Sequence, residues 1–389
     1  MRIVLAHNSY LQRGGEDIVV DAEATLLRGK GHEVVEFRVD NRGLDASSRM
    51  RTAASAIWSF DSKARLERVL AEVRPQVCHF HNTFPLISPS AYRACRAAAV
   101  AVVQTLHNYR LVCPAATLFR DGHPCIECLD RSVPWPGVMH ACYRSSRAAT
   151  AAVAAMLVTH RALGTWEHDV DAYITPSEFA RSMFLSAGFA PDHVFAKPNF
   201  LPLDPGVGEH RGRYALFVGR LTEDKGVLTL LEAWRDIGEQ LPLKVVGTGP
   251  LAHHPHGEQR GVEWLGERGR DEIFSLMRDA TLLVFPSIWF ETFGLTIIEA
   301  FATGLPVVAS RLGTALELIE HGVTGLHFTA GDAQELARSV QRALGDTDGL
   351  AALGKRGRLE FERKFTAAAT YELQMQIYQR AIERRKTTT

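Results

Sequence analysis

The sequence predicts an α/β protein made of two doubly wound, Rossmann-like domains, and three observations support this prediction. The 389 residues are enough for about two domains. Apolar strand patterns alternate with helical patterns along the chain, as in parallel sheets that helices cover on both faces. The alternation pauses at residues 197–213, KPNFLPLDPGVGEHRGR, whose three prolines and three glycines are typical of an interdomain linker.

We expect the first domain over residues 1–196. Its first strand, MRIVLAH, is followed by a helix, EDIVVDAEATLLRGKG, that ends at Gly29–Gly31. The other strand candidates are HEVVEFRVD, PQVCHFHN, AVAVVQTLHN and DAYITPS. A polar or helical stretch follows each of them, which indicates βαβ units with parallel strands.

The second domain is expected over residues 213–365, after a linker at 197–212. Its strand candidates are YALFVGR, LPLKVVG, VEWLGE, TLLVFPS and PVVAS, and its helices include GVLTLLEAWRDI, DEIFSLMRDA and TIIEAFATG. A C-terminal helix at 366–389 ends in a basic cluster and is expected to cross back to the first domain. In doubly wound sheets ligands bind at the carboxyl ends of the strands, so we expect the two domains to face a cleft there.

The net charge and the N-terminal sequence indicate which partners and which cellular compartment to expect. The chain carries 44 basic and 44 acidic side chains, so its formal net charge is zero. This balance argues against nucleic acid as a partner, because nucleic-acid-binding proteins usually show a basic footprint. No signal-peptide pattern follows Met1-Arg2, which predicts a cytoplasmic protein.

One segment departs from the charge balance. Residues 93–161 contain eight arginines, no lysine and three acids. Within them, the Ala-rich run Ala148–Val158 lies between basic residues and is too short to span a bilayer, which takes about 20 residues. The run fits either a buried helix or a helix in contact with the inner face of the cytoplasmic membrane.

Two acids stand out in the apolar segment 285–308, FPSIWFETFGLTIIEAFATGLPVV. Glu291 and Glu299 are eight residues apart there, and burying an unpaired carboxylate is costly. The segment reads as a strand, a loop with Glu291, and a helix whose amino end at TFG would suit an anion such as phosphate. The two acids could then accept hydrogen bonds from sugar hydroxyls. Alternatively, Glu299 is an exposed helix residue and Glu291 a helix-entry acid.

Two cations and several glycines belong to neighbouring strand ends. Arg220 and Lys225 follow the first strand of the second domain in FVGRLTEDKG, where they could neutralise a diphosphate. The alternative is a surface pair beside Glu223 and Asp224. The turn VVGTGP follows the next strand, and its glycines would let the backbone approach a base or ribose.

Together, GRLTEDKG, VGTGPL and the E-x7-E spacing within FPSIWFETFGLTIIEAFATGLPVVAS resemble the family 4 (GT4) retaining glycosyltransferases of GT-B architecture. The resemblance covers nearly the whole chain and is strongest in residues 215–335. It implies transfer of a sugar from a nucleotide donor with retained anomeric configuration and without a catalytic metal. By position, Glu291 would hold donor-sugar hydroxyls, Glu299 the ribose, and Arg220 and Lys225 the diphosphate.

The first domain agrees with this resemblance. RGGED places Gly14 and Gly15 after the first strand, where the family commonly has a Gly-Gly loop, and LHNYR places His107 where a family histidine contacts the donor sugar. Ser177 starts a helix at ITPSEF and is either a site residue, with Glu178, or simply an N-cap. The resemblance thus implies the catalytic residues His107, Arg220, Lys225 and Glu291. The implied donor-binding residues are Gly14, Gly15, Gly219, Arg220, Lys225, Gly247, Gly249, Glu291, Phe293, Gly294, Leu295 and Glu299.

Four of the six cysteines cluster in an insert at about 108–145. They are Cys113, Cys125, Cys128 and Cys142. A C-x2-C pair with two further cysteines in a reducing compartment indicates structural zinc, while reduced thiols and disulfides remain alternatives. Zinc there would shape the acceptor side and take no part in the chemistry. Cys78 and Cys95 are expected in the core.

The leading functional hypothesis is a retaining glycosyltransferase that moves a sugar from a UDP- or GDP-sugar to a glycan or lipid-linked acceptor. Bacterial surface polysaccharide or glycoconjugate synthesis is the expected setting. A non-catalytic GT-B binding or assembly protein is the alternative. An NAD-dependent oxidoreductase is a weaker one, because no G-x-G-x-x-G follows the first strand.

Overall fold

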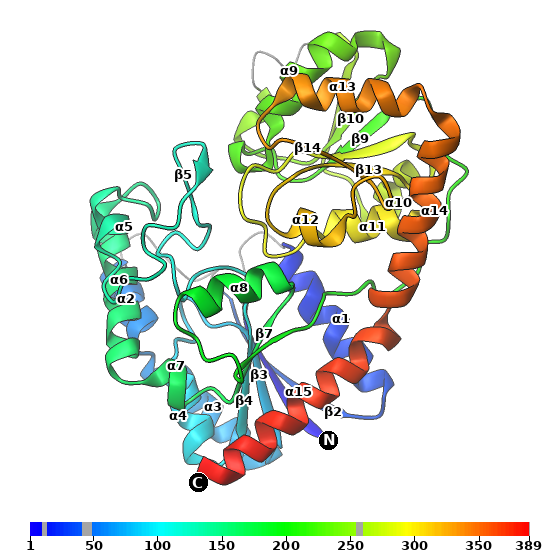
Figure 1. Ribbon diagram of the computed structural model, residues 1–389. Coiled ribbons are helices and arrows are strands. Elements are labelled where there is room, and N and C mark those ends of the chain that lie inside the picture. Colours follow the sequence, from blue (N-terminus) through cyan, green and yellow to red (C-terminus); the bar gives the residue numbers. More distant parts are fainter. Residues whose placement is uncertain (10–13, 41–48, 254–259, 389) are drawn as a thin grey trace. The chain divides into compact units, whose positions relative to one another are not determined.

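The computed structural model describes residues 1–9, 14–40, 49–253 and 260–388, and the chain divides into two compact units (Figure 1). The first unit comprises Met1–Leu118, Ile126–Asn199 and Thr370–Thr389. The second comprises Phe119–Cys125 and Phe200–Ala369. Each unit holds a parallel six-stranded sheet, which confirms the predicted fold class.

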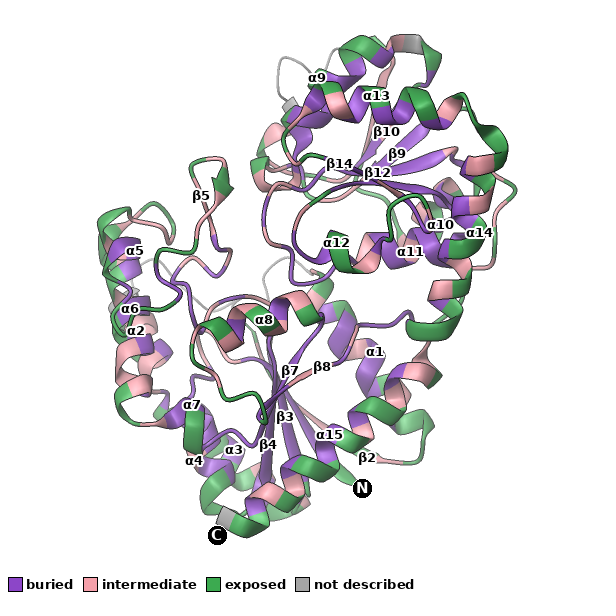
Figure 2. Ribbon diagram, viewed as in Figure 1, coloured by how far each residue is buried: buried purple, intermediate pink, exposed green. Residues whose placement is uncertain are grey.

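The sheet of the first unit has the strand order β2-β1-β3-β4-β7-β8. Its strands are β1 (Arg2–Ser9), β2 (Glu33–Asp40), β3 (Val77–Asn82), β4 (Ala101–Thr105), β7 (Ala172–Thr175) and β8 (Val194–Ala196). All neighbouring strands pair in parallel; Ile3 of β1, for example, lies between Val34 of β2 and Val77 of β3. The central strands are buried, as Figure 2 shows by their colour.

The first unit also contains nine helices among its described residues. They are α1 (Gly15–Gly29), α2 (Arg49–Ile57), α3 (Phe60–Val73), α4 (Ser90–Ala97), α5 (Trp135–Met139), α6 (Arg147–Ala162), α7 (Thr165–His168), α8 (Glu178–Ser186) and most of α15 (Ala367–Thr388). The Cys-rich insert also contains a hairpin of β5 (Phe119–Arg120) and β6 (His123–Pro124). This hairpin is counted with the second unit.

The C-terminal helix α15 completes the core of the first unit. One face of the sheet places Ile3, Leu5 and Val103 in a buried cluster with Leu27 of α1 and Tyr378 of α15. Because residues two apart in a strand share a face, apolar residues of β1, β3, β4 and β7 build this surface together. The last helix thus crosses back to the first unit, as expected.

The second unit is wound in the same way around the strand order β11-β10-β9-β12-β13-β14. Its strands are β9 (Ala215–Val218), β10 (Leu243–Val246), β11 (Val262–Gly266), β12 (Leu282–Phe285), β13 (Val307–Ser310) and β14 (Leu326–Phe328). Its helices are α9 (Val227–Ile237), α10 (Arg270–Asp279), α11 (Leu295–Thr303), α12 (Thr314–Leu318), α13 (Ala333–Leu344) and α14 (Thr347–Lys364), with the short turns η2 (Glu223–Lys225), η3 (Gly238–Gln240) and η4 (Pro250–His253). Two buried clusters, one with α10 and α11 and one with α9 and α13, cover the two faces of the sheet.

The segment expected to be a linker is packed in part, while Leu203 and Val207 within it are exposed. Lys197 is buried in the first unit. Further along, the amides of Gly208 and Gly212 donate hydrogen bonds to backbone carbonyls of the second unit. A Cβ at Gly208 would lie 2.1 Å from the carbonyl oxygen of Arg278, so the glycine permits a close approach of two backbones.

The Ala-rich run forms the middle of α6. Val153, Met156 and Leu157 are buried, and α6 packs against α2 and α5. Internal packing therefore accounts for its apolar face. Among the described helices, none combines the length and the apolar character needed to cross a membrane.

Candidate active site

In the second unit, three loops meet at the carboxyl edge of the sheet, after β9, β10 and β12. A Cβ at Gly226 would lie 1.8 Å from the carbonyl oxygen of Pro286, and one at Gly247 would lie 1.8 Å from that of Gly219. Gly249 has a φ of 156° and would place a Cβ 2.5 Å from the carbonyl oxygen of Leu221. These glycines are therefore required by close contacts between loops. This packing alone explains why glycine stands at 247 and 249, without a bound ligand.

Those loops bring Lys225 and Glu291 together. The Lys225 ammonium lies 2.5 Å from Glu291 Oε1 and 5.3 Å from the centroid of the Trp289 ring. The hydroxyl of Ser287 donates to the same carboxylate oxygen over 2.8 Å, and that of Thr314 donates to the Glu291 carbonyl over 2.6 Å. Glu291 is thus a buried acid that is both paired and hydrogen-bonded, which explains why an apolar segment tolerates it.

The loop with Glu291 leads directly into α11. Gly294 is its N-cap, and a Cβ there would meet Ile297 Cδ1 at 2.8 Å. Phe293 is buried in the core and anchors the start of the helix. The first amides of a helix have no partner within it. The Ile297 amide donates to the Gly294 carbonyl, so the amides of Leu295 and Thr296 before it present a site suited to an anion.

Glu299 and Arg220 have other partners. Glu299 is the fifth residue of α11, about one turn from its start, and its carboxylate lies 3.9 Å from Arg270. Burial raises the pKa of Glu299 to about 7, although its side chain keeps 19% of its exposure, because Arg270 offsets only part of the desolvation. Arg220 is mostly exposed and contacts Asp224 at 3.4 Å. The structure thus joins Lys225 to Glu291, whereas Arg220 contacts Asp224 and Glu299 contacts Arg270.

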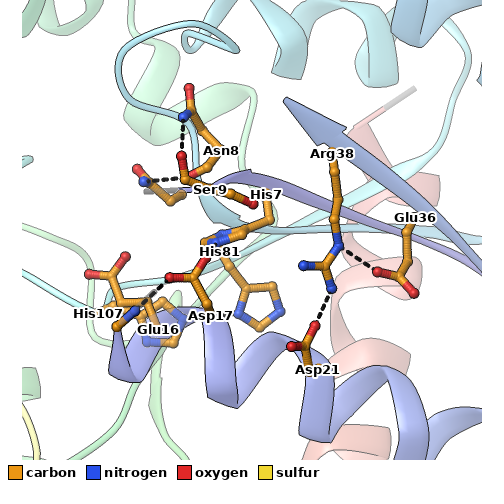
Figure 3. Close-up of polar contacts among 12 residues, drawn as sticks. His7, Asn8, Ser9, Glu16, Asp17, Asp21, Glu36, Arg38, His81 and His107 are labelled. Carbon is orange, nitrogen blue, oxygen red and sulfur yellow. Dashed lines mark hydrogen bonds and ion pairs between the residues drawn. The ribbon is translucent and has the colours of Figure 1, made fainter. Parts of the chain in front are cut away.

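In the first unit, polar side chains replace the apolar ones toward the carboxyl ends of three neighbouring strands. His7 follows Leu5 on β1, and His79 and His81 follow Val77 on β3. Thr105 follows Val103 and ends β4, and His107 lies two residues beyond that strand. His81 Nδ1 lies 2.9 Å from His107 Nε2, and the two rings are stacked with centroids 5.2 Å apart. Figure 3 shows His7, His81 and His107 gathered above the start of α1.

The start of α1 carries the predicted glycines. The amide of Gly14, the N-cap, donates to Asp17 Oδ2 over 2.9 Å, and Asp17 Oδ1 lies 2.9 Å from His7 Nε2 (Figure 3). Asn108 donates to Glu16 over 2.9 Å, which fixes the residue after His107 to the same helix. The predicted residues Gly14 and His107 therefore belong to one polar cluster of the first unit.

A buried acid lies below these histidines. Glu23 is fully buried; Lys197 donates to its Oε1 over 2.8 Å and Gln374 to its Oε2 over 2.9 Å. Oε2 also lies 3.5 Å from His81 Nε2 and 3.6 Å from His79 Nδ1. Sequence patterns had indicated none of these residues as functional, although His79 and His81 follow the period of a strand and could have been noticed.

Burial sets the charges in this cluster. It lowers the pKa of His79 to about 4 and of His107 to about 3, and it lowers the pKa of His81 well below the ordinary value. Burial raises the pKa of Glu23, but the charge and hydrogen bond of Lys197 together with the neighbouring His79 and His107 more than offset this effect and hold that pKa below its usual value. Near neutral pH the three imidazoles are neutral and Glu23 is ionised.

Other predicted residues fall outside these clusters. Ser177 is the N-cap of α8 and accepts a hydrogen bond from the Ala180 amide over 3.0 Å, in line with its N-cap interpretation. Cys78 and Cys95 are buried, as expected.

The Cys-rich insert folds around Gly137. The amide of Cys142 donates to the Gly137 carbonyl, and Cys128 Sγ lies 3.6 Å from where a Cβ of Gly137 would be. Among the described residues, one group of three side chains of metal-binding type has all its ligand atoms within 4.8 Å of one another. This group is Glu23, His79 and His81, and it contains none of the cysteines. Structural zinc at the four cysteines remains a prediction.

Two parallel-sheet units of this topology, with a loop-to-helix anion site in the second, define the GT-B class of glycosyltransferases. Two family models match the chain: Glycosyltransferase Family 4 over residues 13–204 and Glycosyl transferases group 1 over residues 212–346. The chain belongs to the family 4 glycosyltransferases.

Sequence and structure comparisons agree with this membership. An uncharacterized glycosyltransferase of Methanocaldococcus jannaschii is 35% identical over 139 residues, which are 34% of this chain and 35% of that protein. D-inositol 3-phosphate glycosyltransferase of Corynebacterium urealyticum is 33% identical over 148 residues, again 34% and 35% of the two chains. These matches span about a third of each relative's length. HepE of Anabaena, solved with UDP, shares the fold with a TM-score of 0.68 at 19% identity, over 97% of this chain and 99% of that one, and has also been solved with UDP-glucose.

Proposed function

We propose that this protein is a retaining glycosyltransferase that moves a sugar from a nucleotide-sugar donor to a glycan or lipid-linked acceptor. The observation that carries the proposal is the pair formed by Lys225 and Glu291 beside the amino end of α11. It puts a cation, a hydroxyl-binding acid and free helix amides next to one another, which is the set of groups that a sugar diphosphate requires. The UDP and UDP-glucose complexes of HepE support a UDP-sugar as the donor.

In this proposal the second unit stabilises the leaving group. Lys225 and the first amides of α11 bind the diphosphate, and Arg220, which is exposed, adds a second cation when the donor arrives. The bond between the anomeric carbon and the diphosphate oxygen breaks, and that oxygen accepts the proton of the attacking hydroxyl on the same face. Neutralising the developing charge then supplies most of the catalysis.

The test is release of nucleotide from a panel of UDP-, GDP-, ADP- and TDP-sugars. We expect turnover with one nucleotide class and a loss of about 10²–10³-fold in kcat for Lys225→Ala, as for removal of one group that stabilises developing charge. Lys244→Ala is the matched control, since Lys244 on β10 stacks on the ring of Tyr214 at 4.1 Å and takes no part in the proposed site. Equal activity of wild type and Lys225→Ala would refute the site assignment.

Two outcomes separate the alternatives. A non-catalytic GT-B protein would bind nucleotide but release none from any sugar donor. An oxidoreductase would bind NAD and show no preference among sugar nucleotides. If transfer occurs, the anomeric configuration of the product, read by proton NMR, decides between retention and inversion.

We also propose that the protein binds a membrane surface and takes a lipid-linked acceptor from it, in bacterial surface polysaccharide or glycoconjugate synthesis. An exposed patch on the insert supports this idea: Trp135 and Met139 are more than half exposed on one turn of α5, and the Arg131 guanidinium lies 5.3 Å from the Trp135 ring. Arg161 donates to the Arg131 carbonyl and Arg147 to the Met139 carbonyl, so both arginines flank the patch. Apolar and basic side chains together favour an anionic lipid interface.

Sedimentation with vesicles tests this part. We expect the chain to pellet with vesicles of phosphatidylcholine and phosphatidylglycerol and less with phosphatidylcholine alone, and Trp135→Ala to weaken the association. Phe60→Ala is the control, because Phe60 is even more exposed than Trp135, 77% against 54%, but belongs to α3. Association that ignores both the anionic lipid and Trp135 would contradict the proposal.

A further inference from the structure

In the first unit, Glu23, His81 and His107 form a row in which each side chain contacts the next. Neutral imidazole has one nitrogen that donates and one that accepts, and the choice decides what His107 can bind. Its neighbours make that choice through two short steps. The role of His107 toward a sugar rests on the proposed function, whereas its protonation does not.

We propose that Glu23 and His81 are positioning residues that hold His107 in the tautomer with the proton on Nε2, so that Nδ1 is a hydrogen-bond acceptor for a sugar hydroxyl.

The first step is from Glu23 to His81. A carboxylate can only accept, and Glu23 Oε2 lies 3.5 Å from His81 Nε2. This distance exceeds a normal hydrogen bond, so the interaction is chiefly electrostatic, but a negative charge still favours an N–H over a lone pair facing it. His81 Nε2 has no other hydrogen-bond partner among the described residues and is buried. The proton of His81 therefore resides on Nε2.

The second step is from His81 to His107. With its proton on Nε2, His81 offers a lone pair at Nδ1, which lies 2.9 Å from His107 Nε2. A hydrogen bond at this distance needs the proton on His107 Nε2. Nδ1 of His107 then keeps its lone pair and can only accept.

Glu23 itself is held in place from both sides. Lys197 from the end of β8 donates to one oxygen and Gln374 from α15 to the other. Both partners lie far away in sequence, so the acid that orients His107 depends on the helix that returns from the second unit. This arrangement fixes the carboxylate without any freedom to turn away from His81.

The same three residues could be taken for a metal site, since the ligand atoms of Glu23, His79 and His81 lie within 4.8 Å of one another. His79 speaks against this. Both of its ring nitrogens already have hydrogen-bond partners within the fold, the Tyr378 hydroxyl at Nδ1 and the Thr105 hydroxyl at Nε2, each over 2.7 Å. The Lys197 ammonium is also a poor neighbour for a metal cation.

The test reads the tautomer directly. Long-range proton–nitrogen correlation spectra of the ¹⁵N-histidine-labelled chain, without substrate, should show His107 protonated at Nε2. His81→Phe removes the acceptor and should shift His107 toward the Nδ1-protonated form, and Glu23→Gln should do so partly. Thr105→Val is the matched control: it disturbs His79 in the same network and should leave His107 in the wild-type tautomer.

Activity gives the second readout. We expect kcat/KM to fall about 10–100-fold in His81→Phe, the range seen when a group that orients another imidazole is removed. Protonation of wild-type His107 at Nδ1, an unchanged tautomer in both variants, or a bound metal that His81→Phe removes would overturn the inference, and the first of these needs no variant to fold. If wild type turns over no nucleotide sugar, the proposed function fails while the tautomer result stands.

Discussion

At the scale of single residues, Glu299 is an acid whose protonated form is favoured by burial in the folded chain. Burial raises its pKa from 4.5 to about 7. An acid with a higher pKa in the folded chain takes up a proton on folding, so the free energy of unfolding falls as pH rises from about 4.5 through 7. The full shift corresponds to a loss of about 3 kcal/mol.

Glu299→Gln should remove this pH dependence. Urea unfolding should show that the variant gains stability relative to wild type on going from pH 4.5 to pH 8, by about 3 kcal/mol. Glu232→Gln, at an exposed position of α9, should show no such gain. If the two variants respond alike to pH, Glu299 is not the acid responsible.

The glycines predicted at the site divide into two kinds, and alanine distinguishes them. Gly14 has a φ of −122° and nothing within 4 Å of an added Cβ, whereas Gly247 has a φ of 140° and would place the Cβ 1.8 Å from a carbonyl oxygen. Gly247→Ala should therefore destabilise the fold by more than about 2 kcal/mol, while Gly14→Ala stays within about 0.5 kcal/mol of wild type. Thermal unfolding measures both.

The same pair separates packing from binding. With the fold of Gly14→Ala intact, any fall in its nucleotide-sugar turnover reports on close approach of a ligand to the backbone. Unaltered turnover would remove Gly14 from the proposed site, and an unaltered melting temperature of Gly247→Ala would contradict the loop contacts described above.

At the scale of elements, α15 is locked to the first sheet by a buried ion pair. Arg385 lies 3.0 Å from Asp171, and both side chains are 4% exposed. Burial raises the pKa of Asp171, while the Val102 amide and Arg385 lower it in part. Arg385→Met leaves this acid without its cation and should cost about 3–5 kcal/mol in urea unfolding.

Two comparisons show whether the pair is the cause. Adding Asp171→Asn to Arg385→Met should restore part of the loss, since the uncompensated charge is gone. Arg384→Met next to it removes a side chain whose contact with Asp192 is exposed, and it should cost no more than about 1 kcal/mol. A cost of similar size at both arginines would point to helix propensity and not to the ion pair.

The elements also show why sequence patterns succeed and where they stop. Longer periodic segments such as α1 and α9 were predicted correctly, because their apolar residues repeat with the period of a helix. The strands β8 and β14 have three residues each and were missed, since so short a run carries no period. Lys225 and Glu291 were both predicted, as they stand in local motifs.

The cluster around Glu23 could not be predicted in the same way. Its partners Lys197 and Gln374 are 174 and 351 residues away, and only the return of α15 brings them together. In the sequence Glu23 reads as one more polar residue of an amphipathic helix, and Lys197 as the start of a linker. The fold buries the two residues together as an ion pair, and no local sequence pattern predicts this contact.

At the scale of the whole molecule, the returning helix makes the C-terminus part of the first unit while each unit keeps its own core. Tyr378 is fully buried against Ile3 and Val77 in the first unit, and Phe301 is fully buried in the second. The buried clusters that contain them share no residue. We therefore expect the two units to open independently in native-state hydrogen exchange.

Tyr378→Ala and Phe301→Ala test this expectation as a pair. Each removes a buried aromatic ring and should cost its own unit about 3–5 kcal/mol. Mass spectrometry of exchange should show faster exchange of β1 and β3 in Tyr378→Ala, although the mutation lies almost 300 residues further along the chain, and faster exchange of β9 and β12 in Phe301→Ala. UDP binding, which we assign to the second unit, should survive Tyr378→Ala. Equal acceleration of both sheets by either mutation would instead mean that the two units unfold as one, with α15 carrying the coupling between them.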